Sequence, residues 1–223
     1  MNLQGIIFDL DGTIGNTLPL CIQAFRQSIE PLALKRLSDE DIITTFGPSE
    51  EGTIQTLIPE HYEQGIVNYL QFYQDLHDLC PDPFPGIIDL LDQLKARGVR
   101  IAMVTGKGLH STVITLEKFN LKNYFEHIET GSPNGPVKDQ GIAAVLNQWP
   151  DLDKNTILYV GDAPGDITAS RKAGIPVAAA AWAQTAEPQK LLAQQPDYIF
   201  YTITAFADWL QSLLPNTPAA HSN

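Results

Sequence analysis

From residue 87 onward, short apolar runs alternate with longer segments whose apolar residues recur at helical spacing. Strands that alternate with helices of roughly 10–15 residues are typical of a parallel sheet covered by helices on both faces. The predicted strands are 99–105, 126–130, 156–162, 175–181 and 197–201, and the predicted helices between them include 87–97, 110–119, 139–148 and 164–173. Residues 3–9 add a buried strand, because Ile6, Ile7 and Phe8 form a continuous apolar run. The expected fold class is α/β, with a three-layer Rossmann-like core around a parallel sheet.

The first strand is separated from this alternation by a long stretch with helical patterning only. Asn16 or Thr17 can cap a helix that follows, and the clearest helical spacing lies in residues 66–76. The segment "CPDPFPG" (80–86), with three prolines and a glycine, is typical of a hinge or linker. We therefore predict a small α-helical cap domain inserted after the first strand. The expected division is a core of residues 1–14 and 82–215, a cap of residues 15–81 (the cap segment below), and a disordered tail of residues 216–223.

Charge and cysteine content exclude several classes of protein. The net charge of -12 argues against a nucleic-acid or anionic-membrane binder, which needs a basic surface. Cys21 and Cys80 show no metal-ligand spacing and are too few for a disulfide framework, which favours a reducing compartment. Asp9 and Asp11 interrupt the first apolar run too early for a signal peptide, and no run approaches the ~20 apolar residues of a membrane span. We expect a soluble cytoplasmic protein.

Polar residues gather where the predicted strands end. In open parallel sheets, ligands bind beyond the carboxyl ends of the strands, so these residues are the candidate site. They are Asp9 and Asp11 at the end of the first strand, Thr105, Gly106 and Lys107 at the end of the strand at 99–105, Asp162 and Asp166 at the end of the strand at 156–162, and Lys138, which opens a helix. Clustered carboxylates repel one another unless a hard cation lies among them, and an oxygen-rich site of this kind suits Mg²⁺.

These residues form a pattern that resembles a known family. "DLDGT" (9–13), "VTGK" (104–107), Lys138 and "GDAPGD" (161–166) resemble, in order, the four motifs of the haloacid dehalogenase-type hydrolase superfamily. Their spacing is similar to that of members with a small helical cap, the phosphoglycolate-phosphatase-like group. The motifs cover the core, about two thirds of the chain. Any one of them alone is a weak signal, since an aspartate after a strand is often a turn former.

The resemblance implies a phosphatase mechanism. Asp9 attacks phosphorus and forms an aspartyl-phosphate, and Asp11 gives a proton to the leaving oxygen and later takes one from water. Residues i and i+2 of an extended segment point to the same side, so both carboxylates can reach one substrate. The implied Mg²⁺ ligands are an Asp9 oxygen, the backbone carbonyl of Asp11, and Asp162. Asp166 belongs to the same metal group but is expected to hold water or Lys138.

Phosphate binding follows from the same resemblance. The hydroxyl of Thr105 and the amide of Gly106 are expected to hold phosphate oxygens, and Lys138 to offset the charge of nucleophile and phosphate. Lys107 faces the phosphate or lies at the cap boundary. The expected substrate is a small phosphorylated metabolite, with phosphoglycolate as the family-level guess, while the oligomeric state and the rate stay open.

The sequence departs from the family pattern at several positions. Many relatives have an aspartate where this chain has Gly15 or Asn16, and a proline is common where it has Asp139. In the cap segment, "FGPSEEG" (46–52) resembles the family's substrate-facing loop, although an ordinary turn before a helix accounts for it equally well.

Other activities stay open at this level. A dehalogenase is disfavoured because those relatives lack the second aspartate. A phosphosugar mutase is possible, although such relatives more often have valine in place of Thr13. A signalling receiver domain also combines aspartates, a threonine and a lysine around Mg²⁺. However, it runs to ~120 residues as a single unit and carries its phosphorylated aspartate on a middle strand.

Overall fold

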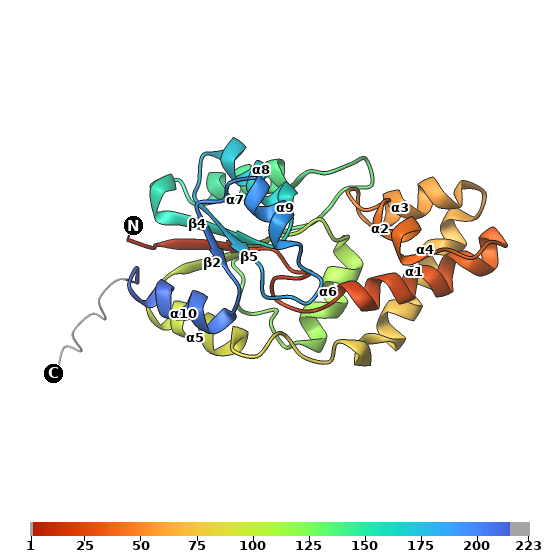
Figure 1. Ribbon diagram of the computed structural model, residues 1–223, viewed down its shortest axis with the longest axis horizontal. Coiled ribbons are helices and arrows are strands. Elements are labelled where there is room, and N and C mark those ends of the chain that lie inside the picture. Colours follow the sequence, from red (N-terminus) through yellow and green to blue (C-terminus); the bar gives the residue numbers. More distant parts are fainter. Residues whose placement is uncertain (1, 215–223) are drawn as a thin grey trace.

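A six-stranded, fully parallel sheet forms the centre of the computed structural model, which describes residues 2–214 (Figure 1). The strand order is β3-β2-β1-β4-β5-β6, with each neighbouring pair parallel. The strands are β1 (Gly5–Phe8), β2 (Arg100–Val104), β3 (His127–Glu129), β4 (Ile157–Gly161), β5 (Val177–Ala180) and β6 (Tyr198–Phe200). The predicted α/β class is confirmed. The tail predicted to be disordered (216–223) lies outside the described residues.

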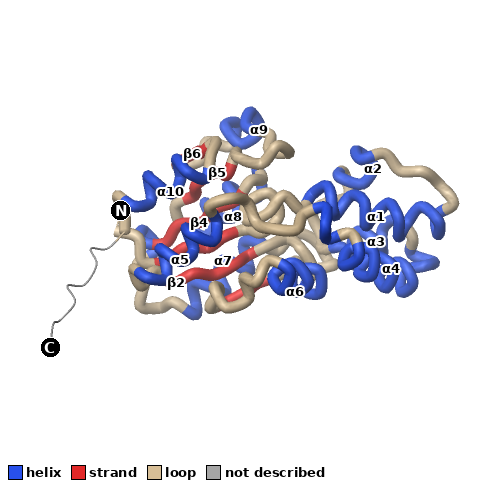
Figure 2. Tube along the Cα trace, turned by 90° about the horizontal axis from the view of Figure 1, so that it is seen from below, coloured by secondary structure: helices blue, strands red, loops and turns tan. Residues whose placement is uncertain are grey.

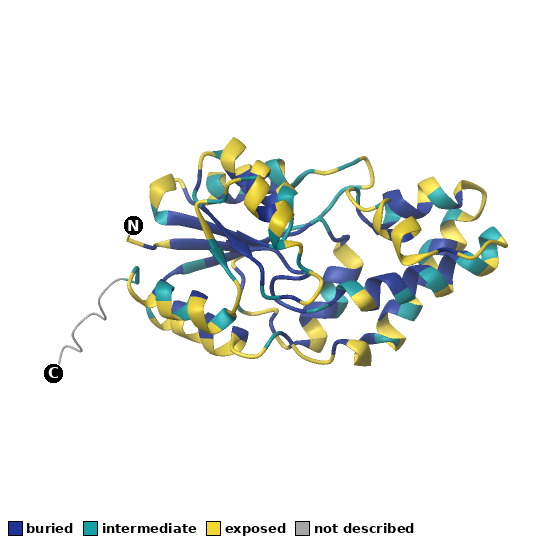
Figure 3. Ribbon diagram, in the orientation of Figure 1, coloured by how far each residue is buried: buried dark blue, intermediate teal, exposed yellow. Residues whose placement is uncertain are grey.

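Helices cover both faces of this sheet, because successive strand residues point to opposite sides. Ile6 and Phe8 pack in an apolar cluster with Phe206, whereas Ile7 between them packs in a second cluster with Ile142. Figure 3 shows the central strands as the buried middle of the molecule, whereas the edge strands β3 and β6 are only partly buried. The first cluster contains residues of α5 (Ile87–Ala96), α6 (Leu109–Lys118) and α10 (Ile203–Gln211), and the second contains residues of α7 (Lys138–Gln148), α8 (Pro164–Ala173) and α9 (Pro188–Ala193).

The element boundaries follow the sequence pattern closely. The predicted helix 164–173 is observed as Pro164–Ala173, and the predicted helix 139–148 begins one residue earlier, at Lys138. Strands are shorter than their apolar runs, as at 175–181, where the ladder covers only Val177–Ala180. Pro176 precedes this strand and has no N–H, so it can only accept, which it does from Tyr159 N at 2.9 Å.

The cap segment is helical, as its pattern predicts. Its elements are α1 (Leu18–Ala33), α2 (Asp39–Ile43), α3 (Glu50–Leu57), α4 (Tyr62–Asp75) and two short 3₁₀ turns, Pro59–His61 and His77–Leu79. Residues 18–79, all of them described, contain no strand. These helices gather at one end of the molecule in both views (Figures 1 and 2). α1 packs against α4, and the ring centroids of Phe25 and Tyr69 are 4.5 Å apart. The exact domain boundaries stay a prediction.

The cap segment is packed firmly against α6 of the core. Tyr73 on α4 shares a 2.7 Å hydrogen bond with the hydroxyl of Thr115, and the rings of His77 and Phe119 meet edge to face at 5.6 Å. The chain passes from the core into the cap segment and back again at two points that lie side by side, because Phe84 N donates to Ile14 O at 2.9 Å. Both crossings therefore adjoin the turn that follows β1. Among residues 2–214, no helix is long and apolar enough to cross a membrane.

Candidate active site

Asp9 lies at the carboxyl end of β1, between β2 and β4. This is the point where the strand order reverses, the usual ligand crevice of an open parallel sheet. Its N–H donates to Val160 O at 2.9 Å, and its Oδ1 accepts from Leu10 N at 2.7 Å. Lys138 Nζ donates to Asp9 Oδ2 at 2.5 Å. Burial raises the pKa of Asp9 to about 6, although Lys138 opposes this shift.

The turn after Asp9 requires glycine at position 12. Gly12 has a φ of +74°, a conformation that disfavours side chains. A Cβ on Gly12 would also lie 2.0 Å from Asp162 Oδ2, so the absence of a side chain lets the Asp162 carboxylate approach the turn. Gly12 N donates to Gly15 O at 2.8 Å, and Trp182 Nε1 donates to Thr13 O at 3.1 Å, which fixes the turn against the loop after β5.

Asp166, at the start of α8, is fully buried and holds Lys138 in place. Its Oδ1 accepts from Lys138 Nζ at 2.5 Å and from Tyr159 OH at 3.0 Å, while its Oδ2 accepts from Ala163 N at 2.9 Å. Burial opposes the charge of Lys138, but the carboxylates of Asp166 and Asp9 raise its pKa above the ordinary value. Lys138 is therefore a cation shared between two aspartates.

Three carboxylates face one another at this edge of the sheet. Ligand oxygens of Asp9, Asp162 and Asp166 all lie within 4.8 Å of one another. Burial raises the pKa of Asp162 well above its usual range, and the negative charges of Asp9 and Asp166 add to this. One ammonium cannot balance three carboxylates, so the donor set fits a hard divalent cation. Because Asp166 already accepts three hydrogen bonds, Asp9 and Asp162 are the better-placed ligands among the three.

The loop after β2 approaches the same place. Thr105 is buried, and its Oγ1 accepts from Lys107 N at 3.2 Å, which leaves the hydroxyl proton free to donate. Gly106 lies beside Lys138, since a Cβ on Gly106 would be 3.7 Å from Lys138 Cε. Gly131 packs directly on Gly106, where an added Cβ would come within 1.9 Å of Gly106 O. Gly106 is thus next to the Lys138 side chain, and Thr105 lies directly before Gly106, at the end of β2.

Lys107 and Asp11 have partners of another kind. The Lys107 side chain is 1% exposed, and its Nζ lies 3.5 Å from Asp11 Oδ1 and 3.3 Å from Glu50 Oε1. The ammonium of Lys107 therefore lies at the cap boundary, which is the second of the two positions expected from the sequence. Asp11 Oδ1 also accepts a hydrogen bond from Thr17 Oγ1. Among the described residues, the Asp11 side chain is outside the group of three carboxylates.

Three residues of this region were missed by the sequence analysis. Thr17 precedes α1, where a capping hydroxyl was expected, but its side chain makes no cap hydrogen bond and donates to Asp11. Tyr159 reads as part of an apolar strand, although its single hydroxyl proton is shared between Asp166 Oδ1 at 3.0 Å and Val104 O at 2.9 Å. Glu50, in the "FGPSEEG" stretch, is 8% exposed and reaches the core. Only Glu50 had a signal, the resemblance of its loop to the family's substrate-facing loop.

A cluster of buried and half-buried carboxylates beside a shared lysine, at the switch point of a parallel α/β sheet, is the arrangement that the sequence motifs predicted for a phosphatase-type hydrolase. A family model described as "Haloacid dehalogenase-like hydrolase" matches residues 6–180. The chain belongs to this family.

Curated relatives include two proteins named Pyrophosphatase PpaX. One, from Anoxybacillus flavithermus, is 28% identical over 205 residues, which cover 89% of this chain and 93% of the relative. The other, from Bacillus thuringiensis, is 28% identical over 217 residues and covers 96% of each chain.

Solved structures share the whole architecture. A haloacid dehalogenase-like hydrolase from Streptococcus pneumoniae is 26% identical with a TM-score of 0.75, covering 94% of this chain and 99% of that one. A predicted phosphoglycolate phosphatase from Haemophilus somnus is 23% identical with a TM-score of 0.77, covering 95% and 98%. At 23% identity, the likeness to the Haemophilus somnus structure concerns the fold alone.

Proposed function

We propose that this protein is a Mg²⁺-dependent phosphatase that hydrolyses a small phosphomonoester through an aspartyl-phosphate on Asp9. One observation carries this proposal. The Asp9 carboxylate, at the carboxyl end of β1, is hydrogen bonded to Lys138 and lies within 4.8 Å of the carboxylates of Asp162 and Asp166. This arrangement combines a nucleophile with a fixed positive charge in one buried site.

The reaction begins with attack of an Asp9 oxygen on phosphorus. The Asp9–phosphorus bond forms as the bond to the leaving oxygen breaks, and Asp11 gives the leaving oxygen a proton. Asp11 then takes a proton from the water that attacks the aspartyl-phosphate, which releases phosphate and frees Asp9. The Thr105 hydroxyl, the Gly106 amide and Lys138 stabilise the negative charge on the phosphoryl oxygens.

Asp9, Asp162 and the backbone carbonyl of Asp11 would hold the Mg²⁺ ion, with Asp166 beside them fixing Lys138. The ion would supply positive charge that lets an anionic substrate enter a protein whose net charge is -12. The close approach of Asp162 to Gly12 supports this ligand set. The turn that carries Asp9 and Asp11 meets the loop that carries Asp162 at Gly12, which has no side chain to keep them apart.

The substrate class is a small phosphorylated metabolite of the kind that phosphoglycolate-phosphatase-like enzymes hydrolyse. Inorganic pyrophosphate is a second candidate, since the curated relatives are named as pyrophosphatases. Cys21 and Cys80 are both free and buried, which fits a reducing compartment such as the cytoplasm.

A panel of phosphomonoesters and pyrophosphate tests the proposal. Free phosphate release is measured with Mg²⁺, with a chelator, and with the Asp9→Asn variant, which preserves size but not nucleophilicity. We expect turnover only in the first arm, with a loss of at least about 1,000-fold in the variant. Turnover that survives in Asp9→Asn would refute the covalent mechanism.

The same assay separates the rival activities. A mutase returns a phosphorylated isomer without releasing phosphate in proportion to substrate consumed. A receiver-like protein keeps a stable phosphoryl group with negligible turnover. Accumulation of either product would replace the hydrolase proposal.

A further inference from the structure

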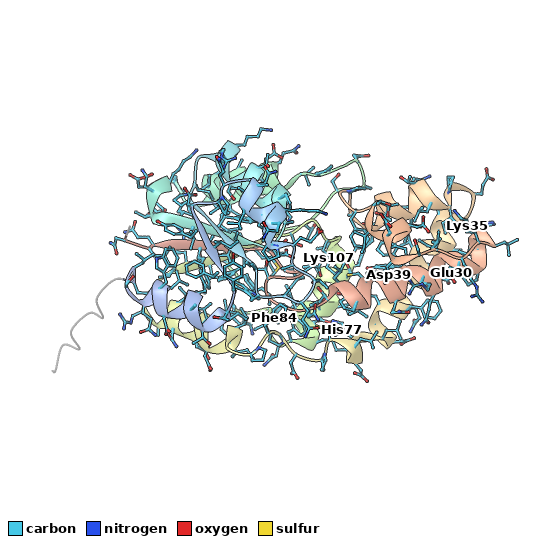
Figure 4. The ribbon with its side chains drawn as sticks, viewed as in Figure 1. Glu30, Lys35, Asp39, His77, Phe84 and Lys107 are labelled. Atoms are coloured by element: carbon cyan, nitrogen blue, oxygen red, sulfur yellow. The ribbon has the colours of Figure 1, made fainter. Side chains whose placement is uncertain are left out.

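Lys107 is the second buried cation near the site, and the mechanism above does not use it. Figure 4 shows Lys107 where the core meets the cap segment. Its ammonium lies 4.3 Å above the Tyr73 ring and 3.2 Å from Cys21 Sγ, and both of these residues belong to the cap segment. Its charged partners are Glu50, from the cap segment, and Asp11, from the core. With 1% exposure, its charge is compensated by protein groups and not by water.

Glu50 is fixed at the junction from several sides. Its Oε1 accepts from Ser111 Oγ at 2.5 Å and from Tyr69 OH at 3.3 Å, and its Oε2 accepts from Gly108 N. Burial alone would raise the pKa of Glu50, but Lys107 and Ser111 hold it below its usual value. The first turn of α3 is therefore attached to the start of α6 by an ionised carboxylate.

Asp11 receives partners from both sides of the same junction. Thr17, which precedes α1, donates to Asp11 Oδ1, and Lys107 approaches that same oxygen at 3.5 Å. The Asp11 side chain is 30% exposed, so its second oxygen can still reach a leaving group. The position of the Asp11 carboxylate thus depends on where Lys107 places its ammonium.

Glu50 and Asp11 compete for this one ammonium. A buried lysine that loses one carboxylate partner moves toward the remaining one, because an unpaired buried charge is costly. Withdrawal of α3 would leave Asp11 as the charged partner that the structure gives to Lys107. Docking of the cap segment is therefore coupled, through Lys107, to the hold on the Asp11 carboxylate.

We propose that Lys107 is a positioning residue that aligns Asp11 for proton transfer when Glu50 docks the cap segment on the core. The proposal rests on the proposed function, since it concerns the step in which the Asp11 proton passes to the leaving oxygen as the bond from phosphorus to that oxygen breaks.

The test compares two esters whose leaving groups differ in their need for a proton. The nitrophenolate of p-nitrophenyl phosphate departs without one, whereas the alkoxide of an alkyl phosphate, such as glycerol 2-phosphate, needs one. The parameter kcat/KM reports only the steps up to departure of the leaving group. Wild-type turnover of both esters is a requirement of the proposed function and is established first.

We expect Lys107→Met to lower kcat/KM for the alkyl ester about 100-fold and that for p-nitrophenyl phosphate less than about 5-fold. Lys107→Arg, which restores the charge, is expected to recover most of the alkyl-ester activity. Glu50→Gln keeps the shape of the side chain. It is expected to lower the ratio of kcat/KM for the alkyl ester to kcat/KM for p-nitrophenyl phosphate about 10-fold, the same direction as in Lys107→Met. Lys122→Met removes an exposed lysine that pairs with Glu117 and is the matched control, with an unchanged ratio.

An equal loss for both esters in Lys107→Met and Glu50→Gln would overturn the proposal, because it would show a general defect in docking or folding. Should Lys107→Met fail to fold, the ester ratio in Glu50→Gln decides alone. An unchanged ratio in Glu50→Gln would show that the cap segment does not act on Asp11 through Lys107.

Discussion

Two buried groups of charges lie near one another in this protein, and they differ in how completely the charges are compensated. At the strand ends, the carboxylates of Asp9, Asp162 and Asp166 lie together, and the one ammonium beside them, that of Lys138, pairs with Asp9 and Asp166. At the cap boundary, Lys107 lies between Glu50 and Asp11, and hydroxyl and amide donors supply further compensation. The first group has an excess of negative charge that a cation can bind, whereas the second is satisfied by the protein itself.

We interpret the first group as the candidate reaction site and the Lys107–Glu50 pair as the connection between core and cap segment, with Asp11 lying where the two meet. Carboxylates that lie close together and have raised pKa values are typical of sites that bind a metal ion or react. A carboxylate with a lowered pKa, such as Glu50, is already committed to its partners. Substitutions in the first group, whose negative charge is only partly compensated, are expected to have larger effects than substitutions of charges that the protein or water already compensates.

Removal of the Lys138 charge is expected to have the largest effect. In Lys138→Met, Asp9 and Asp166 lose their shared partner, and kcat is expected to fall about 1,000-fold, for alkyl and nitrophenyl esters alike. Because a buried pair is broken, the free energy of unfolding is also expected to fall by about 3 kcal/mol. Steady-state kinetics and urea unfolding measure the two effects. A selective loss for the alkyl ester would contradict the contrast with Lys107.

Gly12→Ala is expected to disturb the carboxylate group without changing any charge. The new Cβ meets Asp162 Oδ2 at 2.0 Å on a backbone with positive φ, so we expect a loss of about 3 kcal/mol in unfolding free energy and weaker Mg²⁺ binding. Isothermal titration calorimetry and urea unfolding check this.

Two glycine controls separate the causes. Gly98 has a φ of +72°, but an added Cβ would meet no atom within 4 Å. Gly98→Ala is therefore expected to lower the free energy of unfolding by only about 1 kcal/mol. Gly165→Ala lies in α8 in open space and is expected to be neutral or slightly stabilising. A loss in Gly12→Ala no larger than that in Gly98→Ala would show that the Asp162 contact is unimportant.

The third prediction concerns Asp162 and pH. Its pKa in the folded chain lies well above the ordinary value of 3.8, so the folded state binds this proton more tightly than the unfolded state. The resulting stability is complete below pH 3.8 and is lost as the pH rises. In the presence of a chelator, the free energy of unfolding of Asp162→Asn is therefore expected to exceed that of wild type at pH 7.5, with the difference vanishing near pH 4.

Added Mg²⁺ is expected to reverse this order at pH 7.5, because only wild type gains from binding the ion. Thermal unfolding with Mg²⁺ and with chelator measures the reversal. Equal responses of wild type and Asp162→Asn to Mg²⁺ would remove Asp162 from the ligand set.

The smallest effect is expected from an exposed pair. Lys172 is 72% exposed and pairs with Asp139, so Lys172→Met is expected to change the unfolding free energy by less than about 0.5 kcal/mol. Urea unfolding at low and moderate salt checks this value. A loss comparable to that of Lys138→Met would mean that exposure does not set the strength of these pairs.

The amino-acid sequence by itself determined the α/β class, the element order and most of the strand-end residues. Apolar periodicity is a local property, and parallel strands bring their carboxyl ends to one edge whatever their order. For this reason Asp9, Thr105 and Asp162 were located without coordinates. Lys138 was identified through the family resemblance, although it lies 129 residues from Asp9.

Only the tertiary structure decided which charge meets which. Glu50 is 58 residues from Gly108, and no local pattern distinguishes a glutamate that will be buried against Lys107 from a solvated one at the start of a helix. Thr17 reads as a helix cap, yet its hydroxyl turns to Asp11 because the chain crosses into the cap segment beside that carboxylate. Burial and pairing of charges arise from packing between distant segments, and that packing determines which acidic residues of this protein are paired with cations and which keep uncompensated charge.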